Sequence, residues 1–155
     1  MKKIRILVTL FILILPSYTF AQINFDNPPW EIRCDTMMTQ TDMNICAYES
    51  FCIADSILSQ TYKKIENELI KALNIEKANK TSEADSSSVR RISLIKKQLI
   101  ILAESKLSFC NYRDHMVSLV ELQYQGGSMQ SLMMNALAIE LTVPQIKALT
   151  ELTNY

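Results

Sequence analysis

Four cysteines and one histidine limit the chemistry that this 155-residue chain can perform. An even number of cysteines in a small chain is typical of disulfide bonds in an oxidising compartment. A zinc site would need short, regular ligand spacings, which Cys34, Cys46, Cys52, Cys110 and His115 do not show. We therefore predict two disulfides and neither a metal ion nor a cofactor.

Three carboxylates, Glu49, Asp55 and Asp114, are the candidates for acid–base chemistry. Paired carboxylates hydrolyse glycosides when one of them has a raised pKa beside a substrate cleft. Nothing in the sequence predicts such an environment. With only two glycines, the chain also lacks the residues of a phosphate-binding loop. These patterns favour a binding protein and predict that the chain is not an enzyme.

The elements that position these residues are predicted to be helices. No proline occurs between Glu31 and Val143, and the only glycines are the adjacent Gly126–Gly127 pair. Apolar and small residues recur at steps of three and four over Met43–Leu73 and over Ile92–Tyr124. This spacing predicts two long helices, each with one buried stripe.

The helix ends carry recognisable signals. Thr39 is predicted to cap the first helix with Asp42 as its capping-box acid, while Met38 and Met43 form a hydrophobic staple. The polar segment Asn74–Ser88 is predicted to be the loop between the two long helices.

The C-terminal region is predicted to contain two short helices. A left-handed C-cap at the Gly126–Gly127 pair ends the second long helix. Ser128 then caps a helix over Met129–Glu140, and Pro144 stands in the first turn of another that runs toward Leu152. The predicted fold class is therefore all-α, a long antiparallel helical hairpin with two short C-terminal helices and disulfide staples.

The first 21 residues are predicted to be a signal peptide. Three basic residues precede an apolar run over Ile6–Leu15, and small residues lead to Ala21. That run is shorter than the roughly 20 residues that span a bilayer. We expect cleavage after Ala21, export to the periplasm or the medium, no membrane attachment thereafter, and a single mature domain over residues 22–155.

Four cysteines allow three disulfide pairings. Cys46 and Cys52 would lie about 9 Å apart on a continuous helix, which is too far for a bond. Pairing Cys46 with Cys110 would place Leu73 opposite the polar loop and would require Cys34 to reach Cys52. If Cys52 pairs with Cys110, the residue numbers of any two residues that face each other across the antiparallel helices add up to 162. The predicted ends of the two helices then lie side by side. We therefore predict Cys34–Cys46 and Cys52–Cys110.

Arg113 lies on the buried stripe of the second helix, where a guanidinium must be paired or must reach solvent. In the predicted register it faces Glu49, and Asp55 has Lys106 as its nearest partner. We predict that both are structural ion pairs between the helices. A ligand contact of Arg113 is the less favoured alternative.

The charge layout suggests where a partner would bind. Residues 22–155 carry 13 basic and 16 acidic side chains, which gives no basic footprint for nucleic acid. Six acids and one base fall in residues 22–59, so the disulfide-bonded end of the hairpin is acidic. We expect Asp35, Asp42 and Glu49 to contact a cationic protein.

Several short motifs occur in a characteristic order along the chain. They are Cys34, Thr39–Ala47, Ala54-Asp55, Leu58–Tyr62, Tyr112-Arg113-Asp114, Gly126-Gly127-Ser128 and Leu141-Thr142. This pattern resembles the LprI-like family of bacterial domains, which is named after a lysozyme inhibitor. The resemblance implies an exported, helical, disulfide-bonded domain, with inhibition of host-type lysozyme as the activity attached to the family name.

The chain departs from that family pattern at several positions. Family members usually place one cysteine shortly after the Arg-Asp pair and another just before the Leu-Thr pair, and both are absent here. Cys52 and Cys110 look like a replacement staple. Phe109 stands where a Trp is usual, and Gln145 stands where a basic residue is usual.

The resemblance and the charge layout together predict an exported, non-catalytic protein that binds and inhibits a cationic lysozyme. The alternative prediction is a structural or assembly module of the bacterial cell envelope with no effect on lysozyme. Lysozyme assays at low ionic strength distinguish the two, because charge-steered binding weakens with salt. The sequence makes no prediction of oligomeric state.

Overall fold

The computed structural model describes residues 24–26, 28–31, 34–79 and 86–152, and helices make up most of these ranges. A short 3-10 helix η1 (Cys34–Thr36) precedes three α-helices, α1 (Gln40–Asn79), α2 (Ser86–Gln123) and α3 (Gln130–Leu152). No strand occurs in these ranges, as the predicted all-α class requires. The predicted signal peptide lies outside the described residues.

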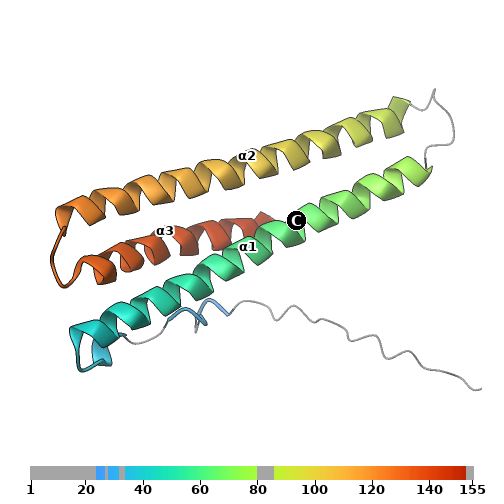
Figure 1. Cartoon of the computed structure of the whole chain (residues 1–155). Coiled ribbons are helices and arrows are strands. Elements are labelled where there is room, and N and C mark those ends of the chain that lie inside the picture. Colours follow the sequence, from blue (N-terminus) through green and yellow to red (C-terminus); the bar gives the residue numbers. More distant parts are fainter. Residues whose placement is uncertain (1–23, 27, 32–33, 80–85, 153–155) are drawn as a thin grey trace, which may run out of the picture.

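Helix α2 runs back along α1, and α3 lies against both of them at the disulfide-bonded end (Figure 1). Three contacts follow one another down the pair of long helices. Asp55 meets Arg113, the ring of Tyr62 meets Lys106, and Glu76 meets Arg91. Because α3 ends beside the middle of α1, the far part of the pair has no third helix (Figure 1).

The predicted Cys52–Cys110 disulfide is wrong, because both cysteines are free. The numbers of facing residues add up to 168 for Asp55 with Arg113 and for Tyr62 with Lys106, instead of 162. This six-residue shift moves the two cysteines apart by about 9 Å along the helix axes. Cys52 moreover lies on an exposed face of α1. In this register, α1 and α2 are joined by the ion pair of the buried Arg113 and not by a disulfide.

The predicted start of α1 is confirmed in its cap. The hydroxyl of Thr39 accepts a hydrogen bond from the Asp42 amide at 3.1 Å and donates one to the Asp42 carboxylate at 2.7 Å. The predicted hydrophobic staple is wrong, because the side chain of Met38 is 97% exposed. The cap therefore rests on hydrogen bonds alone.

Two predicted boundaries are also corrected. Helix α1 continues to Asn79 and α2 begins at Ser86, so most of the segment predicted as a loop over residues 74–88 is helical. The C-terminal region forms one helix and not two, and Pro144 lies inside it. Proline removes the hydrogen bond to the carbonyl four residues earlier, that of Glu140. Both residues are exposed, so water can reach that carbonyl.

The core lies where α1, α3 and the N-terminal segment meet. Its buried members are Trp30, Ala54, Leu58, Tyr62, Ile146 and Leu149. Trp30 lies in a turn that is closed by a hydrogen bond from the Glu31 amide to the Pro28 carbonyl at 3.0 Å. Its ring contacts that of Phe25 edge-on, with the ring centres 6.1 Å apart. The buried tryptophan therefore holds this N-terminal segment against the core.

Candidate functional site

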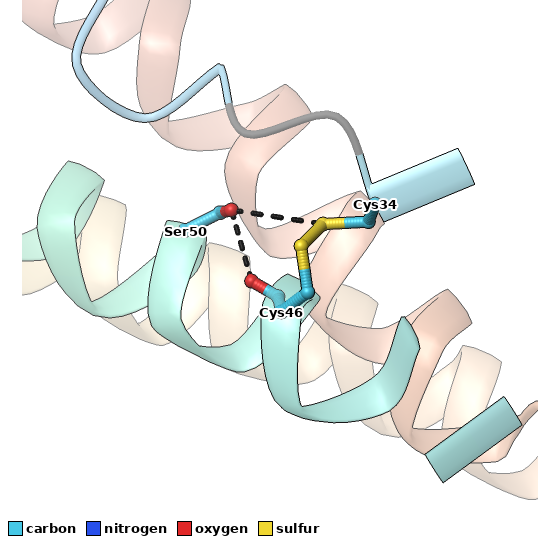
Figure 2. The surroundings of a disulfide bond; sticks show 3 residues. All are labelled: Cys34, Cys46 and Ser50. Atoms are coloured by element: carbon cyan, nitrogen blue, oxygen red, sulfur yellow. Dashed lines mark hydrogen bonds between the residues drawn. A yellow bond between two sulfur atoms is a disulfide. The ribbon is translucent and has the colours of Figure 1, made fainter. Parts of the chain in front are cut away.

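The Cys34–Cys46 disulfide, which the sequence predicted, ties η1 to the second turn of α1 (Figure 2). Its two Cα atoms are 5.6 Å apart. The hydroxyl of Ser50 donates to the Cys46 carbonyl at 2.9 Å and lies 3.9 Å from the Cys34 sulfur. This cross-link and the Thr39 cap fix the backbone at the beginning of α1.

Arg113 joins all three helices at the same end of the molecule. Its Nη1 atom donates to the Asp55 carboxylate of α1 at 2.6 Å and to the Thr142 hydroxyl of α3 at 3.4 Å. Its Nε atom donates to the neighbouring Asp114 at 3.4 Å. The whole residue is only 7% exposed. We call Arg113, Asp55, Asp114 and Thr142 the arginine junction.

Two aromatic rings complete the surroundings of this guanidinium. Its central carbon lies 5.2 Å from the ring centre of Phe51 and 5.8 Å from that of Phe109, within the range of cation–π contact. Burial alone would lower the pKa of Arg113, but the hydrogen bond and charge of Asp55, helped by the charge of Asp114, outweigh burial and raise the pKa. The arginine therefore stays charged inside the protein.

The predicted ion-pair partners are corrected by this geometry. Arg113 pairs with Asp55 and not with Glu49, which is exposed on α1. Lys106 lies 5.9 Å above the ring of Tyr62 and not beside Asp55. The prediction that Arg113 forms an interhelical ion pair is confirmed. The partners of Arg113 and Lys106 differ from the predicted ones because the register of α2 against α1 is shifted.

A pocket of about 570 Å³ opens beside the arginine junction, between the three helices and the α2–α3 turn. Its lining mixes apolar side chains with amides and hydroxyls, and Arg113 and Asp114 lie at its edge. The other lining residues are Asn44, Phe51, Val117, Gly127, Ser128, Gln130, Ser131, Met134, Asn135 and Ala138. Within the described ranges, no three His, Cys, Asp or Glu side chains are grouped to hold a metal ion.

The α2–α3 turn closes one side of this pocket. Gly126 has φ +77°, the left-handed conformation that the predicted C-cap requires. Its amide donates to the Gln130 side chain at 3.0 Å, and the Gly127 amide donates to the Tyr124 carbonyl at 2.9 Å. Helix α3 begins at Gln130, while the Ser128 carbonyl accepts a hydrogen bond from Asn44 of α1. These two glycine amides are already bonded, so the turn ties the helix ends together.

An acidic surface lies on the exposed side of the first turns of α1. Asp42, Ile45 and Tyr48 follow one another at steps of three residues, and Glu49 lies four residues after Ile45. All four are exposed, Ile45 and Tyr48 by more than half. We call these four residues the α1 acidic face. Asp35, the third predicted contact, has its backbone in η1, and its side chain lies outside the described part of the structure.

The free thiol of Cys52 borders this face, one turn beyond Tyr48. A hydrogen bond with Cys52 raises the pKa of the Tyr48 hydroxyl. The sequence singled out the two acids of this surface but not Ile45 or Tyr48. Their positions between the acids, away from the buried stripe, were the available signal.

The chain matches the sequence model of a known protein family. The model of the family "Lysozyme inhibitor LprI" matches residues 33–149, which are most of its length. The chain belongs to the LprI family. A curated relative, "Uncharacterized protein R02472" of Rhizobium meliloti (strain 1021), is 26% identical over 132 residues, 85% of either chain. No solved structure matches.

The LprI match spans the disulfide, the arginine junction, the pocket and the α1 acidic face. Two positions at which this member departs from the expected family pattern can now be placed. Phe109 supplies one of the two rings beside Arg113, a role that a tryptophan ring also suits. Gln145 donates to the Tyr62 hydroxyl at 2.8 Å and so links α3 to α1. None of the described helices is long and apolar enough to cross a membrane.

Proposed function

We propose that this LprI-family protein is exported, has no catalytic activity, and binds and inhibits a cationic lysozyme through the α1 acidic face. The observation that carries the proposal is the combination of the family match with a surface on which two acids lie beside two exposed apolar side chains. We propose that Asp35, whose backbone lies in η1, contacts the same partner.

The composition of the face suits a basic protein partner. Asp42 and Glu49 attract a cationic surface over several ångströms and so raise the association rate. Ile45 and Tyr48 lie next to them on the same exposed side of α1 and are more than half exposed. Their burial against the partner would supply the apolar centre that interfaces need, with tyrosine among the residues that most often dominate binding energy.

The rigidity of α1 supports the same proposal. The Cys34–Cys46 bond, the Thr39 cap and the Asn44 contact with the α2–α3 turn hold the first turns of the helix. A surface that is already ordered loses little conformational entropy on binding, so more of the contact energy appears as affinity.

Export follows from the predicted signal peptide over residues 1–21, with one mature domain over residues 22–155. A periplasmic or extracellular location is where a disulfide is maintained and where a lysozyme is met. We propose this location together with the activity.

The test is a peptidoglycan-lysis assay with an animal-type lysozyme and an excess of the purified protein at low ionic strength. Inhibition is expected, and Glu49→Lys should weaken it about tenfold or more, because like charges then meet at the contact. Glu66→Lys reverses another exposed acid on α1, far from the face, and should change inhibition less than about twofold. Unimpaired lysis with the native protein, or equal effects of the two variants, would refute the proposal.

A further inference from the structure

Helix α2 carries a line of exposed apolar side chains on one flank of the helix, about 100–120° around from the buried Arg113. Leu94, Ile101, Tyr112 and Leu119 are each between 53% and 60% exposed. Of the 38 residues of α2, only Ser88 and Arg113 are buried. A line of large apolar side chains is costly to leave in water and marks a surface that binds something.

The spacing of the four residues keeps them on one line. They are separated by steps of seven, eleven and seven residues, which correspond to about two, three and two helical turns. Seven residues fall short of two turns by about 20°, and eleven exceed three turns by about the same angle. The line therefore runs straight along about 38 Å of helix without drifting around it.

The order of these steps, seven, eleven and seven residues, is the same from either end of the helix. A two-fold axis that passes between Lys106 and Leu107 exchanges Leu94 with Leu119 and Ile101 with Tyr112. An interface between two identical copies about a two-fold axis needs this kind of self-complementarity, which a different partner would not. We propose that two copies of this protein associate through Leu94, Ile101, Tyr112 and Leu119, with their α2 helices antiparallel.

The charges of α2 favour the same arrangement. Residues 86–103 hold four basic side chains and no acid, whereas residues 104–123 hold three acids and two bases, one of which is the buried Arg113. A parallel pair would align the two basic halves and make them repel. An antiparallel pair avoids this alignment of the two basic halves, so the charges along the helix favour the antiparallel orientation.

The contact is small, and the dimer is accordingly weak. Four apolar side chains from each copy, with their neighbours, fall below the roughly 20 to 30 residues a side of a standard stable interface. Near the axis, the short side chains of Ser105 and Ser108 face each other across the pair and allow the helices to approach closely. The dimer leaves the α1 acidic face unused, so it does not depend on the proposed function.

Sedimentation of the native protein tests the association, at concentrations up to about 1 mM so that even a millimolar dissociation constant is detected. A concentration-dependent dimer is expected, and Ile101→Lys should abolish it. Leu107→Lys is the matched control. Leu107 is 64% exposed but lies about 140° around the helix from Tyr112, so this variant should dimerise like the native protein. A monomer at every concentration, or equal effects of both variants, refutes the dimer.

Cross-linking tests the orientation in a Cys52→Ser, Cys110→Ser background. Leu94→Cys and Leu119→Cys protein are oxidised separately and as a mixture. The antiparallel register requires the mixture to form a mixed disulfide at least about tenfold faster than either protein alone. Fast self-linking of Leu94→Cys alone would indicate a parallel pair and would overturn the register. Binding of the native monomer to lipid vesicles, lost in Ile101→Lys, would assign the line to a membrane and refute the proposal.

Discussion

At the scale of single residues, Arg113 explains more of this structure than any other side chain. One guanidinium contacts side chains of all three helices and two aromatic rings. Its carboxylate partner Asp55 is not deeply buried, since its side chain is 41% exposed. Arg113 is therefore paired with a carboxylate that water partly reaches. Because Arg113 itself is buried, its removal should lower the stability of the fold.

Replacement of this arginine gives the first prediction. Arg113→Ala should lower the free energy of unfolding by about 2 to 3 kcal/mol, less than for a fully buried pair because water partly screens Asp55. Urea denaturation measures this change. Arg91→Ala, which breaks the exposed pair with Glu76, should cost at most about 1 kcal/mol. Equal costs of the two substitutions would show that the junction is no stronger than a surface pair.

The two free thiols allow a second prediction. Under non-reducing conditions, peptide mapping should find Cys34 joined to Cys46 and should recover Cys52 and Cys110 as labelled thiols. Cys52 should react first in the folded protein, because it is exposed and Cys110 is half-buried. A peptide that joins Cys52 to Cys110 would restore the register predicted from the sequence and would remove the Arg113–Asp55 pair.

At the scale of elements, the sequence predicted what periodicity and caps determine and missed what packing determines. The stripe from Met43 to Leu73, the Thr39 cap and the glycine C-cap depend on neighbouring residues, so local rules suffice. The register of α1 against α2 depends on contacts such as Asp55 with Arg113, which no local rule describes. For the candidate site, the sequence identified the acids of α1, but the pocket needs three helices to be placed first.

Pro144 shows how an element boundary can be misjudged. A proline usually starts or ends a helix, yet here the helix continues through it because burial of Ile146 and Leu149 beyond the proline holds the C-terminal part in place. Local preference was outweighed by packing against the core.

This leads to a prediction for α3. Pro144→Ala restores an amide that can donate to the Glu140 carbonyl, so it should raise the free energy of unfolding, by up to about 3 kcal/mol. Thermal unfolding followed by circular dichroism measures the change. Ala148→Pro, which adds a proline to the same helix at another exposed position, should destabilise the protein. If Pro144→Ala were destabilising, the proline would serve the packing of α3.

At the scale of the whole molecule, the structure has two unequal parts. At the disulfide-bonded end, three helices enclose the core, the arginine junction and the pocket (Figure 1). Beyond Tyr62, α1 buries only Leu73, and before Arg113, α2 buries only Ser88. Two helices with so little buried surface gain little free energy from packing, so stability concentrates in the three-helix part.

Hydrogen exchange followed by mass spectrometry tests this division and connects it with the proposed dimer. Amides of residues 66–79 and 86–100 should exchange faster than those of residues 54–62, because opening of a thinly packed segment costs less free energy than global unfolding. Antiparallel pairing places Leu94 of this weaker part against Leu119 of the three-helix part of the other copy. Protection around Leu94 should therefore rise with protein concentration in the native chain and in Leu107→Lys, but not in Ile101→Lys. Uniform protection along α1 and α2 at low concentration would contradict the two-part description. Protection around Leu94 that does not change with protein concentration would contradict the dimer alone.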